Sequence, residues 1–253
     1  MRRLSASVLC WQLLALQASA QEAAGNPVEE LPVVTIQAIK DPVTWPYRTL
    51  LAGLDAFDTE RGLAPSATLR FRIRNPRGLG GLALQLAGEH AAVDIPLDAE
   101  SQFALGRGMV DDPGEAVLKL NRGRGEFNCD CLPQAVVRTP GLPANAVRIG
   151  DLRLECQVTM AIAKKQLGFL KSAGLSALGG MDWCDPRQAV KYAVRAPLPF
   201  NSVTFGAGGR RMTQRFDKTA STLKVRLADK TWPDDTLIEF DHVPEPAAAS
   251  ATR

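Results

Sequence analysis

The side chains best suited to chemistry are four cysteines after residue 20, namely Cys129, Cys131, Cys156 and Cys184. An even number of cysteines in an exported chain predicts disulfides, because oxidising compartments form and keep them. If the chain around "NCDC" is extended, Cys129 and Cys131 share a face with Cα atoms about 6.5–7 Å apart, at or beyond the limit of disulfide geometry. We therefore expect separate bonds from these two to Cys156 and Cys184. The sequence leaves open which takes which.

A Cys₄ metal site and a redox-active thiol pair are the alternatives. Zinc sites normally space their cysteines as C-x₂₋₄-C, whereas Cys129 and Cys131 are one residue apart and no second pair exists. A thiol–disulfide catalyst normally carries C-x-x-C at the start of a helix that follows a strand. The sequence therefore favours structural disulfides, with no metal and no cofactor.

Other catalytic candidates lack the partners that their chemistry needs. Ser221 and Lys224 match the S-x-x-K of penicillin-recognising serine enzymes, but "TLKVRL" predicts a strand, which sends them to opposite faces, and S-D-N and K-T-G are missing. His90 and His242 lie at the edges of predicted strands without a matching motif. The glycine-rich, basic segment 205–211 could cradle an anion, but between two predicted strands it is more often a plain connection.

Glu239 and Asp241 share a face of a predicted strand and form a candidate glycosidase-like carboxylate pair. The polar outer face of an antiparallel strand produces the same spacing, and we favour that interpretation. No G-x-S-x-G, H-E-x-x-H or P-loop occurs in the chain. The sequence therefore leans toward a protein that is not an enzyme, without deciding the matter.

One basic surface is a candidate for binding. In "TLRFRIR" the side chains of Arg70, Arg72 and Arg74 alternate with apolar residues and share one face of a predicted strand. A solvated sheet face is the simpler explanation. Such a contiguous basic face could also bind an acidic polymer or protein of the cell envelope.

The first twenty residues have the layout of a secretory signal peptide. "MRR" is positively charged, "LSASVLCWQLLAL" is apolar but too short to span a membrane, and small residues precede a cleavage point after Ala20. We expect export to the periplasm or the extracellular space, a retained N-terminal anchor being the alternative. No later segment is long and apolar enough for a transmembrane span.

The charge of the expected mature chain is nearly balanced. The full sequence has 30 basic and 27 acidic residues. Removal of Arg2 and Arg3 with the signal peptide leaves one more basic than acidic residue. Nucleic acids reward a concentrated basic field, so the sequence argues against that partner.

Apolar spacing predicts one helix and several short strands before residue 138. Residues 21–45 are expected to be a lead-in with a short strand at 33–37. Tyr47, Leu50 and Phe57 fall on one stripe of a helix that has Pro46 in its first turn and ends at Gly62. Strands are predicted within residues 68–74, 82–88, 91–98, 102–105 and 115–121, with a hairpin at 121–126. Their close spacing predicts a small antiparallel sandwich or barrel.

The second half of the chain contains segments with the apolar spacing of strands and segments with that of helices. Residues 138–151 are rich in Pro and Gly and predict a long surface loop or domain connection. "DLRLECQV" alternates like a strand and "AIAKKQLGFLKSAG" turns helical, although a single helix from Leu152 to Ala173 fits almost as well. Further strands are predicted within 199–208, 221–230 and 234–243, and residues 244–253 as a disordered tail or tether.

Two resemblances follow from these segments. "ATLRFRIRN…GLALQLAG…AVDIPLDAESQFAL" (67–105) resembles the small sandwich domains of the transthyretin and carboxypeptidase-regulatory-like type, with Glu100–Ser101 where those domains have a glycine turn. "YRTLLAGLDAFD", "LRFRI" and "TPGLPANAVRIGDLRLECQV" also resemble uncharacterised exported proteobacterial proteins. The first implies a β-sandwich. The second implies a compartment and transfers no catalytic residue.

We therefore expect a β-rich α+β protein: a helix plus a sandwich-like unit over 46–137 and a disulfide-stapled α+β half over 138–243. Its expected function is that of a soluble, non-enzymatic binding or structural module of the cell envelope. An envelope glycan or peptide hydrolase and a thiol-based metal carrier are the alternatives.

Overall fold

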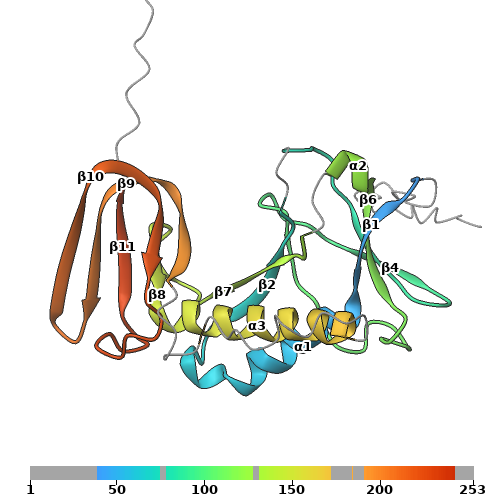
Figure 1. The fold of residues 1–253 in the computed structure, drawn as a ribbon, viewed down its shortest axis with the longest axis horizontal. Coiled ribbons are helices and arrows are strands. Elements are labelled where there is room, and N and C mark those ends of the chain that lie inside the picture. Colours follow the sequence, from blue (N-terminus) through green and yellow to red (C-terminus); the bar gives the residue numbers. More distant parts are fainter. Residues whose placement is uncertain (1–38, 75–77, 128–130, 172–183, 185–190, 243–253) are drawn as a thin grey trace, which may run out of the picture. The chain divides into compact units, whose positions relative to one another are not determined.

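The computed structural model describes residues 39–74, 78–127, 131–171, 184 and 191–242 (Figure 1). The expected signal peptide, the strand at 33–37, Cys129 and the tail at 244–253 lie outside these residues. The described residues are rich in antiparallel β-structure with few helices, as the sequence predicts. No helix in this part of the chain has the length and apolar character of a membrane span.

Two antiparallel sheets form the N-terminal part. The strands predicted within 68–74, 82–88, 91–98, 102–105 and 115–121 are confirmed, whereas the strands at Pro42–Pro46, partly inside the expected lead-in, and at Gln134–Arg138 were not predicted. The first has the order β1-β6-β3-β4, from β1 (Pro42–Pro46), β6 (Val117–Gly123), β3 (Leu84–Ala87) and β4 (Ala92–Ile95). The second has the order β5-β2-β7, from β5 (Gln102–Phe103), β2 (Thr68–Arg72) and β7 (Gln134–Arg138). Residues of both sheets share one buried cluster, the N-terminal core.

The predicted hairpin at 121–126 is wrong. Strand β6 runs through Gly123, and the chain then forms a short helical turn, α2 (Arg124–Phe127). Strand β6 pairs with β1 and β3, whereas the next strand, β7, joins the other sheet beside β2. Glycines between two apolar segments therefore mark a change of sheet here rather than a tight turn.

The predicted first helix is confirmed as α1 (Tyr47–Thr59), which begins directly after β1 with Pro46 at the N-cap. Tyr47, Leu50 and Phe57 are buried as their spacing requires. The helix ends at Thr59 rather than Gly62, because the chain tightens into the 3₁₀ turn η1 (Arg61–Leu63).

The strand predicted over 151–158 is wrong, and the single-helix alternative is right. Residues Ile149–Lys171 form one helix, α3, which directly follows a short strand, β8 (Ala146–Arg148), inside the segment predicted as a loop. The residue before its first turn is Arg148, which is not one of the residue types that cap helices. Instead the N–H groups of Ile149 and Gly150 donate to the carbonyls of Thr236 (2.9 Å) and Asp234 (2.8 Å).

The alternation in "DLRLECQV" arises because α3 is buried on two sides. Leu154, Val158 and Ile162, four residues apart, belong to the N-terminal core. Residues Ile149, Leu152 and Cys156 belong to a second cluster, the C-terminal core, with β9–β11. Each stripe has helical spacing, but the two stripes together place apolar residues at 152, 154, 156 and 158. The sequence therefore alternates although the segment is a helix.

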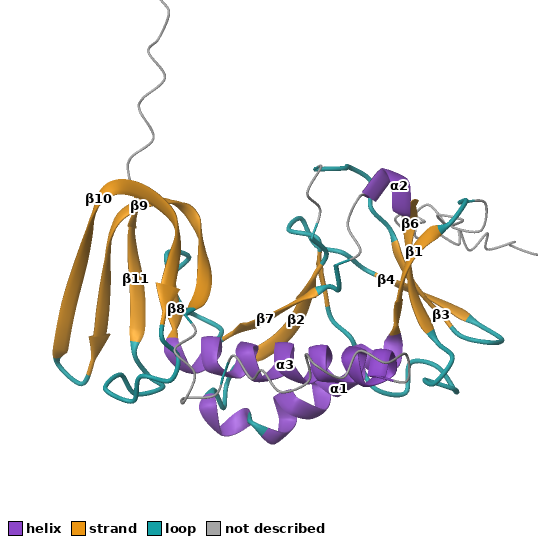
Figure 2. Cartoon of the chain, viewed as in Figure 1, coloured by secondary structure: helices purple, strands orange, loops and turns teal. Residues whose placement is uncertain are grey.

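Helices α1 and α3 lie side by side (Figure 2). At Gly53 of α1 an added Cβ would lie 2.8 Å from Cδ1 of Ile162, which is closer than carbon atoms pack. The crossing therefore depends on the absence of a side chain at Gly53.

The C-terminal sheet is antiparallel with the order β10-β9-β11-β8. Strands β9 (Tyr192–Ala207) and β10 (Arg210–Val225) form a long hairpin, and β11 (Leu237–His242) pairs with β9 and β8. Gly208 and Gly209 make its turn with positive φ angles of 53° and 79°, which glycine adopts without strain. The strands predicted within 199–208 and 234–243 are confirmed, and the one predicted within 221–230 is the end of β10.

Candidate functional site

The disulfide pairing differs from the expected one. Cys156 and Cys184 bond to each other, with Cα atoms 5.9 Å apart, so neither is available to Cys129 or Cys131. Cys131 is itself disulfide-bonded, and Cys129 lies outside the described residues. The expectation failed because it assumed an extended chain around "NCDC", whereas the residues just before it form the helical turn α2. Among the described residues, no group of three or more His, Cys, Asp or Glu side chains is placed to hold a metal.

Three charged side chains on the first turns of α3 are buried: Asp151, Arg153 and Glu155, with exposed fractions of 2%, 7% and 9%. The Asp151 carboxylate accepts hydrogen bonds from the backbone N–H (2.8 Å) and the hydroxyl (2.7 Å) of Thr139. It also lies in the first turn of α3, where the helix dipole favours a negative charge. Asp151 thus fixes the chain after β7 to the start of α3.

Arg153 points to the loop between β10 and β11. Its guanidinium donates to the backbone carbonyls of Leu227 (2.8 Å), Asp229 (2.7 Å) and Trp232 (3.0 Å). It also forms an ion pair with the carboxylate of Asp234. Only the planar fork of arginine can satisfy several acceptors at fixed angles in this way. The residue therefore orders the loop, and four of its five N–H donors are engaged in doing so.

Glu155 is held between β7 and β9. Its carboxylate accepts the backbone N–H of Val137 (3.1 Å) and the hydroxyl of Tyr192 (2.6 Å). Burial raises the pKa of Glu155 to about 7, against the opposing effects of these two hydrogen bonds and of nearby Arg72. Burial likewise raises the pKa of the Tyr192 hydroxyl. The pair is a buried acid that titrates near neutrality, and its contacts join strands of two sheets to α3.

The candidate basic face on β2 is not uniformly solvated. Arg70 donates to the carboxylate of Asp98 (3.0 Å) and to the carbonyl of Gln102 (3.2 Å). Arg72 is half-buried and acts electrostatically on Glu155, whereas Arg74 is exposed. The three arginines therefore have three different environments, and a binding role for them as one surface stays a prediction.

The carboxylates of β11 have separate partners. Glu239 forms an ion pair with Arg211 (2.8 Å), and Asp241 accepts the hydroxyl of Ser202 (2.9 Å). Strand register places both on the outer, polar face of the sheet. Their spacing is thus that of an ordinary solvated face, and catalysis by the pair stays a prediction.

The remaining candidates are scattered. His90 is exposed beside Glu89, and His242 stacks against Phe240. Ser221 and Lys224 are exposed on β10, a strand and not the helix that S-x-x-K chemistry needs.

The predicted loop at 205–211 contains the β9–β10 turn. Its two arginines both have protein partners. Arg210 lies 4.2 Å from the ring centroid of Trp232, and Arg211 pairs with Glu239.

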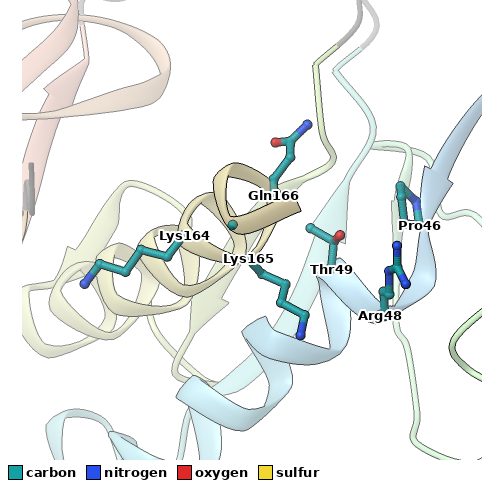
Figure 3. Close-up of a pocket in the computed structure, with 7 residues that line it drawn as sticks. Pro46, Arg48, Thr49, Lys164, Lys165 and Gln166 are labelled. Carbon is teal, nitrogen blue, oxygen red and sulfur yellow. The ribbon is translucent and has the colours of Figure 1, made fainter. Parts of the chain in front are cut away.

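A cavity of about 530 Å³ lies between the N-terminus of α1 and the C-terminal turns of α3 (Figure 3). This volume is in the range of small-molecule sites. The described residues that line it comprise three cationic side chains, two polar ones, a proline and a glycine: Arg48, Lys164, Lys165, Thr49, Gln166, Pro46 and Gly168. No acidic side chain is among these lining residues.

The geometry around the cavity favours an anion. Figure 3 shows Lys165 reaching from α3 toward α1, where Arg48 and Thr49 lie, whereas Lys164 extends the other way. The N–H groups of Arg48 and Thr49 belong to the first turn of α1, which has no side-chain cap and no acidic residue. Such N–H groups have no acceptor within their own helix, and the helix dipole is positive at this end.

Sequence reasoning did not find this cavity. The adjacent lysines of "AKKQ" and the arginine of "YRTL" are visible in the sequence, but each has the pattern of a solvated helix face. What brings them together is the crossing of α1 and α3, which end and begin 90 residues apart in the chain, and no local signal encodes that crossing.

Comparisons with known proteins supply no family. No family model, no curated protein and no solved structure matches the chain.

Proposed function

We propose that this chain is an exported, non-enzymatic binding module of the cell envelope, and that it takes a small anionic ligand in the cavity between α1 and α3. The observation that carries the proposal is the lining of that cavity: three cationic side chains, a hydroxyl and an amide without a carboxylate among them. Phosphate or carboxylate groups complement this lining, because ionised acceptors form the strongest hydrogen bonds with such donors.

The buried charges elsewhere support a scaffold role for the rest of the fold. The carboxylates of Asp151 and Glu155 and the guanidinium of Arg153 are engaged by backbone and side-chain groups of the protein. They hold elements of the fold together. We also propose that the two N-terminal sheets pack as a sandwich, since Phe71 and Phe103 of one share a core with Leu118 of the other.

The test measures anion binding by the protein, expressed with its own N-terminus in a host that exports proteins. The mass of the recovered protein shows whether residues 1–20 have been removed. Titration with inorganic phosphate and pyrophosphate is followed by calorimetry. We expect pyrophosphate to bind more tightly than phosphate, and the affinity to fall as salt is added. The double variant Arg48→Gln/Lys165→Gln should lose roughly tenfold or more in affinity, equivalent to about 1.4 kcal/mol.

The matched control is Arg226→Gln/Lys230→Gln, which removes the same charges from exposed positions outside the cavity. It should bind as the wild type does. If both double variants lose affinity equally, the binding is a property of net charge and the cavity proposal fails. It fails as well if neither anion binds the wild-type protein.

A further inference from the structure

Strand β10 is an open edge of the C-terminal sheet (Figure 1). It pairs with β9 along one side, and in the part of the chain that the structure describes no strand pairs with its other side. Residues 210–215 are exposed on both faces of the strand. The unpaired N–H and C=O groups of such an edge are a template for one more strand.

The charge of this edge is strongly one-sided. Strand β10 carries five basic residues and one acidic residue: Arg210, Arg211, Arg215, Lys218, Lys224 and Asp217. Arg211 is paired with Glu239. Arg215 and Lys218 are exposed and form no ion pair with any described residue. The positive charge of this edge therefore favours an added strand that carries carboxylates and disfavours a basic one.

Alternation sorts the edge into two faces. Arg211 and Arg215 lie on one face, about 13 Å apart at the rise of a strand. Met212 lies on the other face, opposite Phe205 of β9, and 42% of its surface is exposed. A complementary strand would thus place acidic side chains at alternate positions beside the arginines and an apolar side chain beside Met212.

We propose that β10 binds an acidic, extended polypeptide segment of a partner protein by strand addition. The backbone of the segment pairs with residues 210–215, and its alternate acidic side chains lie beside Arg211 and Arg215. A second copy of this chain fits less well, because pairing β10 with itself would set arginines and lysines against each other. This surface is separate from the α1–α3 cavity and does not depend on it.

Charged residues on an edge strand also serve to prevent aggregation, so the experiment must separate attraction by charge from pairing by backbone. The probe is the peptide Thr-Glu-Val-Glu-Val-Glu-Thr with blocked ends, titrated into the oxidised protein and followed by amide NMR. We expect saturable shifts confined to β9 and β10, with slowed hydrogen exchange at the outward N–H groups of 210–215. The same peptide methylated on alternate backbone nitrogens keeps its charge, cannot pair with an edge, and should bind at least roughly tenfold more weakly.

Two variants complete the test. Arg215→Glu/Lys218→Glu should abolish binding of the acidic peptide, whereas Arg226→Glu/Lys230→Glu reverses the same number of charges off the strand and should not. Circular dichroism verifies that both variants fold. Equal binding of the methylated peptide, or unchanged binding by Arg215→Glu/Lys218→Glu, overturns the proposal. Sedimentation of the protein without peptide gives a further test. If the wild type is a dimer and Arg215→Glu/Lys218→Glu is a monomer, a second copy of the chain occupies the edge and the proposal is overturned.

Discussion

Replacing Glu155 by glutamine is expected to remove a pH dependence of stability that the wild-type chain owes to this one side chain. In the folded protein burial raises the pKa of Glu155 from 4.5 to about 7. Between these values the folded state holds a proton that the unfolded state has released, so the free energy of unfolding falls as pH rises through this window. At 1.36 kcal/mol per pH unit, the loss is about 3 kcal/mol and is complete above the folded pKa.

Glutamine suits the site because it keeps both contacts without a charge. Its carbonyl oxygen can accept the N–H of Val137, and its amide can donate to the hydroxyl of Tyr192, which can turn to accept. The variant should therefore fold, and above about pH 7 it should be more stable than the wild type.

The assay is urea unfolding of both proteins at about pH 5 and about pH 8, with the difference in unfolding free energy taken at each pH. Contributions from all other carboxylates cancel in that difference. We expect it to shift by about 2.5 kcal/mol in favour of the variant between the two conditions, because a small part of the effect is already present at pH 5. Glu89→Gln is the matched control at an exposed site and should show no such shift. A difference that is the same at both pH values would refute the raised pKa of Glu155.

Two further predictions concern the start of α3. Gly150→Ala should destabilise the fold by several kcal/mol, because the added Cβ would lie 2.2 Å from the carbonyl oxygen of Leu63. The control is Gly62→Ala, whose added Cβ meets no atom within 4 Å. Equal stability of the two variants in urea unfolding would contradict the close approach at Gly150. Arg153→Met should cost about 3 kcal/mol because it leaves several buried carbonyls unpaired. Arg226→Met, at an exposed position, should be neutral, and thermal unfolding of both variants checks this.

The helices and strands that could be predicted from the spacing of apolar residues are those with a single buried face. Helix α1 has a single apolar stripe with a proline at its start, and both its beginning and its amphipathic face follow from the sequence. Short strands β2, β3, β4 and β6 were likewise found by alternation. In each case one face contacts one core, so the period of the apolar residues reports the backbone geometry directly.

The elements that could not be predicted are those whose partners are distant. The N-terminus of α3 is capped by the carbonyls of Asp234 and Thr236 instead of by its own residues, so no capping signal precedes it. The predicted disulfide pairing is wrong for a related reason. An extended backbone around "NCDC" predicts that Cys156 bonds to Cys129 or Cys131, whereas its partner is Cys184. The candidate cavity depends on a helix crossing, which the sequence encodes only through the fit of Gly53 against α3.

The sequence "DLRLEC" nevertheless contained a signal that distinguishes a doubly buried helix from a strand. On a half-buried strand the charged residues at alternate positions face water and need no partner. Here Asp151, Arg153 and Glu155 are all buried, and each binds backbone groups of a different element. Acidic and basic residues at positions i, i+2 and i+4 that alternate with apolar ones thus fit a helix placed between two cores. Because a buried charge is costly unless its partner is in register, these three residues also constrain how α3 can lie against β7 and β9.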